Sequence, residues 1–523
     1  MTTRRNFFKC CGASAALLGL NQRALVRADV PDHLWSGYDF GPGPKIVDRL
    51  NQGPFGVEQD DGWRTIASTT ASGKPLRNFG LGLCGYTWEE SGPSLAARAG
   101  KQTLEDHVEK MASLPFVDVL YIRCDWRDVQ KKPGKLDLMP VWKLTMDAAK
   151  TYGQRVAFRV QLSNTAFQPR QLAVPDFLQQ KIPFANIGRS PSTHGNFDYR
   201  EPQYNHPEFQ KAFRELNELL AAEFDGHPLV EFMDLMMYGF WGEGHTSDLK
   251  NPFPDYPTAE KTMVEMTRLQ LDAWKKTPLA VNTEPDISKV GNREVHDICV
   301  REGCWLRSDS ILDIEEALQV ENLANRPPWL AVVMEDGGYR DYDIAHIPLD
   351  EAGINLREKA MLHVLDLGAN YWSLWTEGEN LKRYNERYPR GFDTLQKRMG
   401  YRVRPSWVWQ RKRYGTSEVI VSVTNDGVSG IPGALRLSLE SLDGRFKMGG
   451  SLDAGHPHGG KIRQASFVLP RGFEGQKLKL HAEIETKGIR RPVNWACEQP
   501  LERSDSFFIE LKSFDAPGWR KGV

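Results

Sequence analysis

The sequence predicts an α/β protein in which a closed (β/α)8 barrel precedes a small antiparallel β-sandwich. Between residues 76 and 401, short apolar runs alternate eight times with segments of helical period, which is the strand and helix count of a (β/α)8 barrel. After residue 402 the helical period disappears, and alternating apolar and polar residues are separated by Asn, Asp and Gly turns. An open doubly wound sheet is the alternative fold, because periodicity does not show whether a sheet closes.

The individual elements follow from the same patterns. The eight barrel strands are expected at residues 76–86, 117–124, 155–162, 232–240, 279–284, 304–309, 330–335 and 370–377. The helices are expected at residues 103–114, 138–152, 207–224, 258–276, 294–302, 313–322, 355–367 and 394–399. Residues 330–334 form an unbroken apolar run, as expected of a strand buried on both faces. Residues 163–206, rich in Pro, Asn and Gln, are expected to form a loop with short helices over the barrel mouth.

The β-sandwich is expected to occupy residues 402–523, with strands at 418–424, 434–440, 477–485 and 506–512. At the other end of the chain, Arg4 and Arg5 precede a short apolar run over residues 10–20 and small residues up to Ala28. This order matches a twin-arginine signal peptide at residues 1–28, and the run is shorter than the ~20 residues that cross a bilayer. We therefore expect export to the periplasm or the cell exterior, and an N-terminal extension at residues 29–75.

Composition narrows the class of ligand. The 523 residues include 67 Lys and Arg against 68 Asp and Glu, a net charge of -1, which argues against a nucleic-acid partner. The mean hydropathy of -0.50 excludes a multi-span membrane protein. The 15 Trp, 15 Tyr and 24 Phe suit a carbohydrate partner, because aromatic faces stack on sugar rings. No phosphate-binding loop or HExxH motif is present, so we expect no cofactor and no metal.

Two glutamates follow predicted barrel strands, where the active site of this fold forms. Glu243 follows the fourth strand among aromatic residues and glycines, and Glu335 ends the seventh. A carboxyl beside Trp241 in a poorly hydrated mouth is expected to have a raised pKa, which suits a general acid. Four other acidic residues end predicted strands and are rival partners of Glu243 or orienting groups. These rivals are Asp125, Glu284, Asp309 and Glu377.

The order of these motifs resembles the retaining glycoside hydrolases of clan A, with a family 42-like barrel and a C-terminal β-domain. The resemblance rests on the two strand-end glutamates and on residues 121–128, 133–138 and 152–156 around the second and third strands, and it covers about residues 76–400. It implies that Glu335 is the nucleophile and Glu243 the acid and base. In the clan, an Asn comes immediately before the acid and base glutamate, but this chain has Gly242 before Glu243. The resemblance therefore implies that Asn164 or Asn282 contacts the sugar instead.

The resulting hypothesis is an exported glycosidase that cleaves a β-linked poly- or oligosaccharide, such as a β-galactoside, with retention. The expected substrate-binding residues lie near strand ends and are Trp126, Asn164, Trp241, His245, Asn282, Tyr339, Trp372, Trp375 and Glu377. Arg123, Arg159 and Arg307 are expected to bridge carboxylates inside the barrel, or else to bind an anionic sugar. The alternatives are a non-catalytic carbohydrate-binding barrel and a metal-dependent barrel hydrolase.

Overall fold

The computed structural model describes residues 62–90, 92, 102–188, 198–246, 254–284, 289–312, 316–337, 347–501 and 503–515. The expected signal peptide, residues 29–61 of the expected extension and Tyr339 lie outside these ranges. Within the described ranges, no helix has the length and apolar character needed to cross a bilayer.

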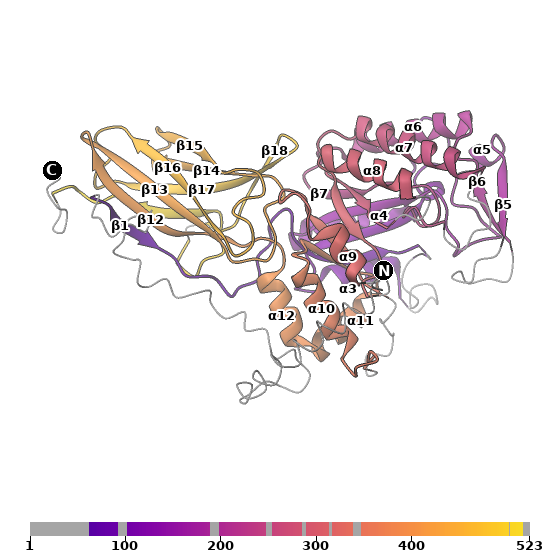
Figure 1. The fold of residues 1–523 in the computed structure, drawn as a ribbon, viewed down its shortest axis with the longest axis horizontal. Helices are drawn as coiled ribbons and strands as arrows, with labels where there is room; N and C mark the ends of the chain where they lie inside the picture. The colour runs from indigo at the N-terminus through magenta and orange to yellow at the C-terminus, as the bar shows by residue number, and fades with distance from the viewer. Residues whose placement is uncertain are drawn as a thin grey trace, which may run out of the picture.

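Eight strands close into a barrel, and neighbouring strands are parallel, which confirms the predicted fold class (Figure 1). Around the barrel the order is β10, β11, β2, β3, β4, β7, β8 and β9, so strands that follow one another in the chain are also hydrogen-bonded neighbours. The bounds are β2 Gly82–Trp88, β3 Val119–Asp125, β4 Arg155–Gln161, β7 Val230–Asp234, β8 Leu279–Asn282, β9 Trp305–Ser308, β10 Val332–Glu335 and β11 Tyr371–Leu374.

Helices between consecutive strands surround the barrel. Their bounds are α3 Leu104–Ala112, α4 Pro140–Tyr152, α6 Pro207–Phe224, α7 Tyr256–Ala273, α8 Lys289–Arg301, α9 Glu316–Leu323, α10 Leu356–Asp366, α11 Gly378–Arg387 and α12 Pro389–Arg398. Local sequence sets their ends. Helix α6 begins at Pro207, where a missing N–H costs nothing, and the ring of the preceding His206 accepts a hydrogen bond from the Glu208 N–H. One face of α6 is buried against the barrel through Phe213, Leu216 and Leu220.

The side chains that face into the barrel change character along its axis. Toward the N-terminal ends of the strands they are apolar, and Phe232 of β7 and Trp305 of β9 pack 5.6 Å apart between ring centroids. Two residues further along, the same strands carry Asp234 and Arg307, both buried. Because residues i and i+2 of a strand share a face, a charged layer lies directly above the aromatic one, toward the C-terminal ends.

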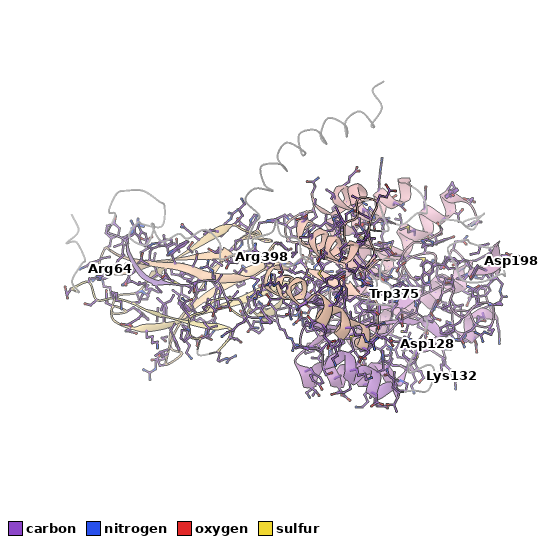
Figure 2. All side chains as sticks on the ribbon, turned by 90° about the horizontal axis from the view of Figure 1, so that it is seen from below. Arg64, Asp128, Lys132, Asp198, Trp375 and Arg398 are labelled. Carbon is purple, nitrogen blue, oxygen red and sulfur yellow. The ribbon has the colours of Figure 1, made fainter. Side chains whose placement is uncertain are left out.

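The C-terminal β-domain contains two packed sheets, as predicted. One sheet has the order β1, β12, β13, β16, and the other has β15, β14, β17, β18, with β19 also paired to β17. The bounds are β1 Arg64–Ser68, β12 Val403–Arg413, β13 Thr416–Asn425, β14 Ala434–Ser441, β15 Lys447–Ser451, β16 Ile462–Leu469, β17 Lys477–Thr486, β18 Ile489–Pro492 and β19 Ser506–Glu510. Strand β1 comes from the expected extension and pairs antiparallel with β12. Its Arg64 lies far from Trp375 of the barrel (Figure 2).

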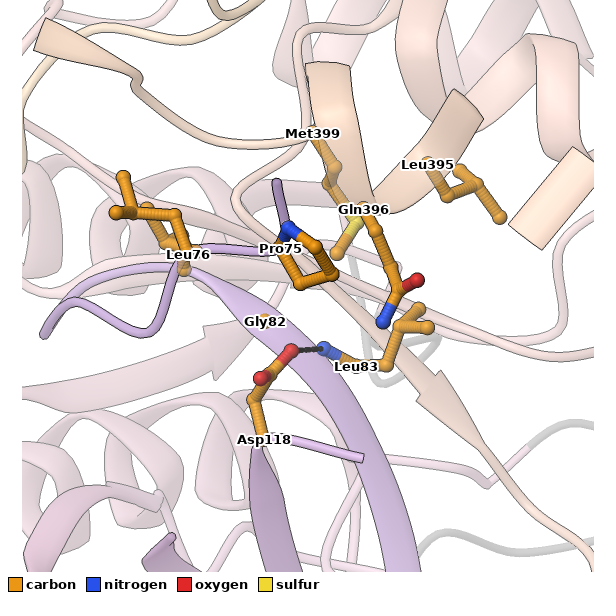
Figure 3. A pocket seen from close by; sticks show the side chains of 9 residues that line it. Pro75, Leu76, Gly82, Leu83, Asp118, Leu395, Gln396 and Met399 are labelled. Carbon is orange, nitrogen blue, oxygen red and sulfur yellow. Dashed lines mark hydrogen bonds between the residues drawn. The ribbon is translucent and has the colours of Figure 1, made fainter. Parts of the chain in front are cut away.

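The β-domain closes the floor of the barrel. Val403 and Ile431 of this domain belong to the same buried apolar cluster as Phe232 inside the barrel, and the Tyr401 hydroxyl donates to the Phe79 carbonyl at 2.7 Å. A small recess at this end is lined in part by Pro75, Leu83, Asp118 and Met399 (Figure 3), and there the Asp118 carboxylate accepts a 3.1 Å hydrogen bond from the Leu83 N–H. The C-terminal ends of the strands, where the active site of this fold forms, lie at the opposite end of the barrel.

Several features differ from the sequence-based expectations. In the β-domain, strands β12, β15, β16 and β18 were not predicted. The segment 163–206 contains the expected short helix, α5 Asp176–Gln179, but also an unpredicted hairpin of β5 Phe184–Gly188 and β6 Tyr199–Pro202. Helix α11 was also not predicted, because its ten residues are mostly polar. Its helical conformation depends on burying Leu381 and Tyr384, a tertiary effect that the local pattern does not show.

Candidate active site

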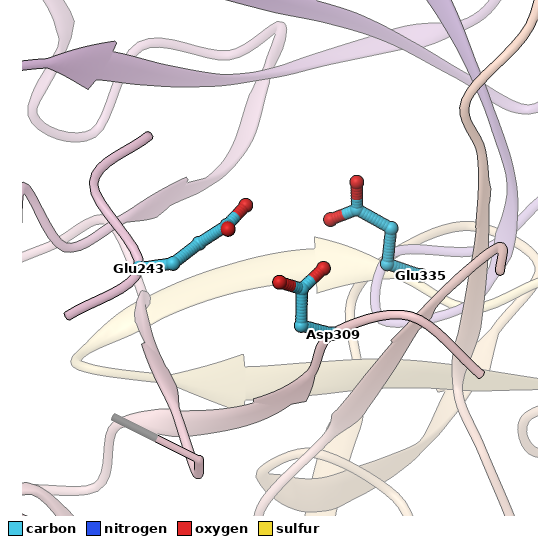
Figure 4. Close-up of side chains that lie close together, drawn as sticks. All are labelled: Glu243, Asp309 and Glu335. Atoms are coloured by element: carbon cyan, nitrogen blue, oxygen red, sulfur yellow. The ribbon is translucent and has the colours of Figure 1, made fainter. Parts of the chain in front are cut away.

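Three carboxyl groups meet at the C-terminal end of the barrel (Figure 4). Glu335 is the last residue of β10, Asp309 follows β9, and Glu243 lies in the turn that follows β7. One oxygen of each lies within 4.8 Å of an oxygen of both others. The side chains of Glu243 and Glu335 are buried, with 3% and 2% of their surfaces exposed, whereas Asp309 is partly exposed. The two predicted catalytic glutamates are therefore brought together, and one of their predicted rivals joins them.

A tight turn directs Glu243 into the barrel. The Glu243 N–H donates to the Phe240 carbonyl at 3.1 Å, and the Asn282 side-chain amide donates to the Glu243 carbonyl at 2.8 Å. Gly242 has a φ of +75°, and a Cβ atom there would lie 3.1 Å from Cδ of Arg159. An asparagine before Glu243, as in the clan that the sequence resembles, would therefore meet both backbone strain and the Arg159 side chain.

Three arginines pair with these carboxylates. Arg123 of β3 donates to Glu243 and, at 3.1 Å, to Glu335, and it also lies 3.3 Å from Glu90. Arg159 of β4 lies 2.5 Å from Glu243 and 3.1 Å from Asp234. Arg307 of β9 pairs with Glu335 and, at 3.1 Å, with Asp234. The expectation that these arginines bridge carboxylates is confirmed.

The arginines decide which carboxyls are ionised. Burial by itself raises the pKa of Glu335, but Arg307, Arg123 and Arg159 outweigh it and lower that pKa to about 2. Burial also raises the pKa of Glu243, and there Arg123 and Arg159 outweigh it, so the net shift is downward. The expected upward shift for Glu243 was wrong, because the sequence shows the neighbouring Trp241 but not two guanidinium groups that arrive from other strands.

Asp309 and Glu284, by contrast, have raised pKa values. Burial raises the pKa of Asp309 well above its usual value, and the negative charges of Glu243 and Glu335 raise it further. Burial also raises the pKa of Glu284 to about 7, although Thr283 and Ser308 donate hydrogen bonds to it at 2.8 and 3.0 Å. The site therefore combines two glutamates whose pKa values are lowered with an aspartate, Asp309, whose pKa is raised.

Several of the predicted substrate-binding residues surround this cluster. Trp375 is partly exposed, and the Arg123 guanidinium lies 5.9 Å from its ring centroid. The rings of Trp241 and His245 lie 5.0 Å apart beside Glu243. Asn164 donates to Asp125 at 2.9 Å and to the Glu90 carbonyl at 2.7 Å. Glu377 is half-buried and precedes α11.

Two of the predicted substrate contacts are wrong. Trp126 is completely buried, stacks edge-on against Phe209 and donates to Gln130 at 2.8 Å. Trp372 is also completely buried and packs against Tyr384 and Phe392 outside the barrel. Both rings belong to the hydrophobic core, so neither is available to a sugar. Sequence position near a strand end did not show which side of the barrel wall each ring would occupy.

Sequence reasoning also missed functional neighbours. Asp234 ends β7 and pairs with two of the arginines, and Glu90 lies two residues beyond β2 and pairs with Arg123. The signal for Asp234 was present, since it is two residues after the buried Phe232 and so shares its inward face.

The three carboxyls are also the one set of three potential metal ligands found among the residues that the structure describes. Carboxylate oxygens suit a hard cation such as Mg²⁺ or Ca²⁺. Arg123 and Arg307 occupy both oxygens of Glu335, and Arg123 and Arg159 share one oxygen of Glu243. These positive charges already neutralise the carboxylates and would repel a cation, so the set is better arranged for guanidinium partners.

No protein-family model and no curated protein matches the chain. Among solved structures, it is similar to the catalytic domain of β-amylase from Paenibacillus polymyxa, with 10% identity over 61% of this chain and 98% of that one and a TM-score of 0.38. It is also similar to an exo-β-1,4-mannosidase from Opitutaceae bacterium strain TAV5, with 14% identity over 58% and 54% and a TM-score of 0.38. A third is endo-glycoceramidase II from Rhodococcus sp., with 13% identity over 76% and 100% and a TM-score of 0.37. At these values the likeness gives no information on reaction or substrate.

Proposed function

We propose that the protein is a glycoside hydrolase that cleaves β-linked poly- or oligosaccharides with retention, and that a β-galactoside is the first substrate to test. The observation that carries the proposal is the contrast within one cluster of carboxyls. The pKa of Glu335 is lowered to about 2, whereas the pKa of Asp309, whose carboxyl lies within 4.8 Å, is raised well above its usual value. Neighbouring carboxyls with pKa values pushed apart are the arrangement that acid and nucleophile roles require.

The spacing supports retention. Retaining glycosidases have their two carboxyls ~5–5.5 Å apart, whereas inverting ones leave ~6.5–9.5 Å for a water molecule. Glu243 and Glu335 have oxygens within 4.8 Å, which is nearer to the retaining spacing than to the inverting one. The export pathway inferred from Arg4 and Arg5 completes the proposal, with the periplasm or cell exterior as the site of action.

In the proposed reaction, a Glu335 oxygen forms a bond to the anomeric carbon as the glycosidic C–O bond breaks. The leaving oxygen takes a proton from the opposite side of the site, where Glu243 and Asp309 lie. Water then attacks the anomeric carbon of the glycosyl-enzyme and gives a proton to the carboxyls at Glu243 and Asp309. The bond to Glu335 breaks, which releases Glu335. Arg307 and Arg123 keep Glu335 anionic before attack and stabilise it when it leaves. The partly exposed rings of Trp375 and Trp241 offer faces for the sugar.

Substitution of the nucleophile tests this proposal. Glu335→Gln keeps the side-chain size but removes the attacking anion, so hydrolysis of aryl β-glycosides should fall by about 10³-fold or more. Glu231→Gln is the matched control, because Glu231 is an equally buried barrel glutamate that pairs with Arg155 near the floor, 2.6 Å away. NMR of the first-formed product should show the β-anomer.

Other results would point to the alternatives. Sugar binding without hydrolysis by the unmodified protein would identify a non-catalytic carbohydrate-binding barrel. Hydrolysis that a chelator abolishes and a divalent cation restores would identify a metal-dependent hydrolase. Full activity of the Glu335→Gln variant would rule out the assigned nucleophile.

A further inference from the structure

We propose that Asp309 is the general acid and base of this site, and that Glu243 is the ionised residue that positions it. The inference rests on the proposed glycosidase function and specifies which side chain delivers the proton. It differs from the assignment that the sequence resemblance implies, in which Glu243 itself is the acid.

The first argument is access. Asp309 is partly exposed, whereas Glu243 and Glu335 lie deeper, with only 3% and 2% of their surfaces exposed. A general acid must come within hydrogen-bonding reach of the leaving oxygen. Of the three carboxyls, Asp309 is the one that a ligand entering from the mouth meets first.

The second argument is the location of the proton. One Glu243 oxygen already accepts hydrogen bonds from both Arg123 and Arg159, which favours the ionised form. Asp309 and Glu243 also have oxygens within 4.8 Å of each other, and two carboxyls this close favour a proton on one of them. The charged groups that act on Asp309 are Glu243, Glu335 and, opposing them, Arg123. Because two arginines bond Glu243, we place the proton of the pair on Asp309.

The third argument is that the backbone fixes Asp309 against the nucleophile. The Ile311 N–H donates to the Glu335 carbonyl at 2.9 Å, and the Ser310 N–H donates to the Asp309 carboxyl at 2.9 Å. Ser310 and Leu312 have φ angles of +40° and +66°, in the left-handed region that non-glycine residues rarely adopt. Such strain persists only where the surrounding structure holds the backbone in place, and it often occurs at active sites.

An independent observation indicates that the space beside this cluster receives a polar ligand. Gln161 lies two residues beyond Arg159 on β4, so it shares the inward face, and it is fully buried. Neither its amide nitrogen nor its amide oxygen has a hydrogen-bond partner among the described residues, and Oδ1 of the buried Asn282 lacks one too. Buried amides without partners are costly, and the hydroxyl groups of a sugar would supply them.

The proton balance of the step is complete. Asp309 gives its proton to the glycosidic oxygen as the C–O bond breaks and Glu335 bonds to the anomeric carbon, which leaves Asp309 ionised. In the second half, Asp309 takes a proton from the attacking water as the bond to Glu335 breaks. Glu243 remains ionised throughout, and its charge favours return of the proton to Asp309. No group beyond the substrate and one water is consumed.

The test uses the dependence of rate on the leaving group. Asp309→Asn keeps a hydrogen-bond donor for Glu243 but has no proton to transfer, so kcat/KM should fall by about 10²–10⁴-fold on an alkyl or disaccharide substrate. A dinitrophenyl glycoside of the same sugar, whose leaving group needs no proton, should react within about tenfold of the wild-type bond-cleavage rate. Added azide, which needs no general base, should accelerate turnover of the variant. The basic limb of the kcat/KM pH profile should also disappear.

Asp118→Asn is the matched control, because Asp118 is a buried carboxyl with a raised pKa near the barrel floor. The Asp118→Asn variant should keep the wild-type ratio of kcat/KM between the dinitrophenyl glycoside and the alkyl or disaccharide substrate. If Glu243→Gln instead shows the leaving-group dependence and azide acceleration while Asp309→Asn shows neither, the inference is overturned and Glu243 is the acid. An unmodified protein that hydrolyses no glycoside would refute the proposed function itself, and the inference with it.

Discussion

Arg123 is predicted to hold together two carboxylates that otherwise repel each other. Its guanidinium donates to both Glu243 and Glu335. One carboxylate oxygen of Glu243 lies within 4.8 Å of one of Glu335. At an effective dielectric constant of about 20, two charges at that distance repel by about 3.5 kcal/mol. Arg123→Gln removes the shared counter-ion and leaves both glutamates buried. We therefore expect the free energy of unfolding at pH 7 to fall by about 3–5 kcal/mol, as when one partner of a buried ion pair is removed.

Urea denaturation at pH 7 and pH 5, followed by tryptophan fluorescence, measures this effect. Without Arg123, one glutamate of the pair should have a folded-state pKa above its unfolded value. The folded variant then binds a proton that the unfolded chain does not, so its stability should rise as the pH falls from 7 to 5. The difference in the free energy of unfolding between wild type and variant should therefore be smaller at pH 5 than at pH 7.

A double variant separates this explanation from a loss of packing. Arg123→Gln combined with Glu335→Gln removes one of the two repelling charges, so it should be more stable at pH 7 than Arg123→Gln alone. If the single variant is as stable as wild type, or if the second substitution destabilises it further, the repulsion argument is refuted.

Two further outcomes follow from the same site. Because folding lowers the pKa of Glu335 to about 2, the stability that Glu335 contributes is present above its unfolded pKa near 4.5 and is lost as the pH falls toward 2. Between pH 5 and pH 3, the free energy of unfolding in urea should therefore change less for Glu335→Gln than for wild type. Gly242→Asn should lower stability by about 1–3 kcal/mol and displace Arg159. Gly134→Asn is the control and should cost less, because Gly134 has a similar φ of +74° but no atom lies within 4 Å of its Cβ position. Equal losses of stability in thermal unfolding would contradict the steric argument.

The barrel could be predicted because its signal is local. Each strand buried on both faces is an apolar run, and each covering helix repeats its apolar residues with a period of 3.6, so eight alternations are visible without any long-range information. The β5–β6 hairpin and helix α11 were missed for the same reason. Their apolar patterns are weak, and burial of a few residues such as Leu381 stabilises them only in the folded chain.

The candidate site was predictable in part. Glu243 and Glu335 follow strands whose C-terminal ends meet in a barrel, so their proximity follows from the fold. Trp126 and Trp372 were assigned to the site on the same reasoning and lie in the core. Position along the chain fixes the height of a residue in the barrel. It does not fix whether a side chain beyond the strand turns toward the axis or toward the helices.

The sequence by itself determined the order of strands and helices, the acidic residues at the strand ends and the arginines expected to pair with them inside the barrel. Only the tertiary structure decided which carboxyl has a lowered pKa and which has a raised one. Arg123 and Glu335 are 212 residues apart in the chain but 3.1 Å apart in the barrel. A pKa depends on charge at that short distance and on exclusion of water, and both arise only when the barrel closes.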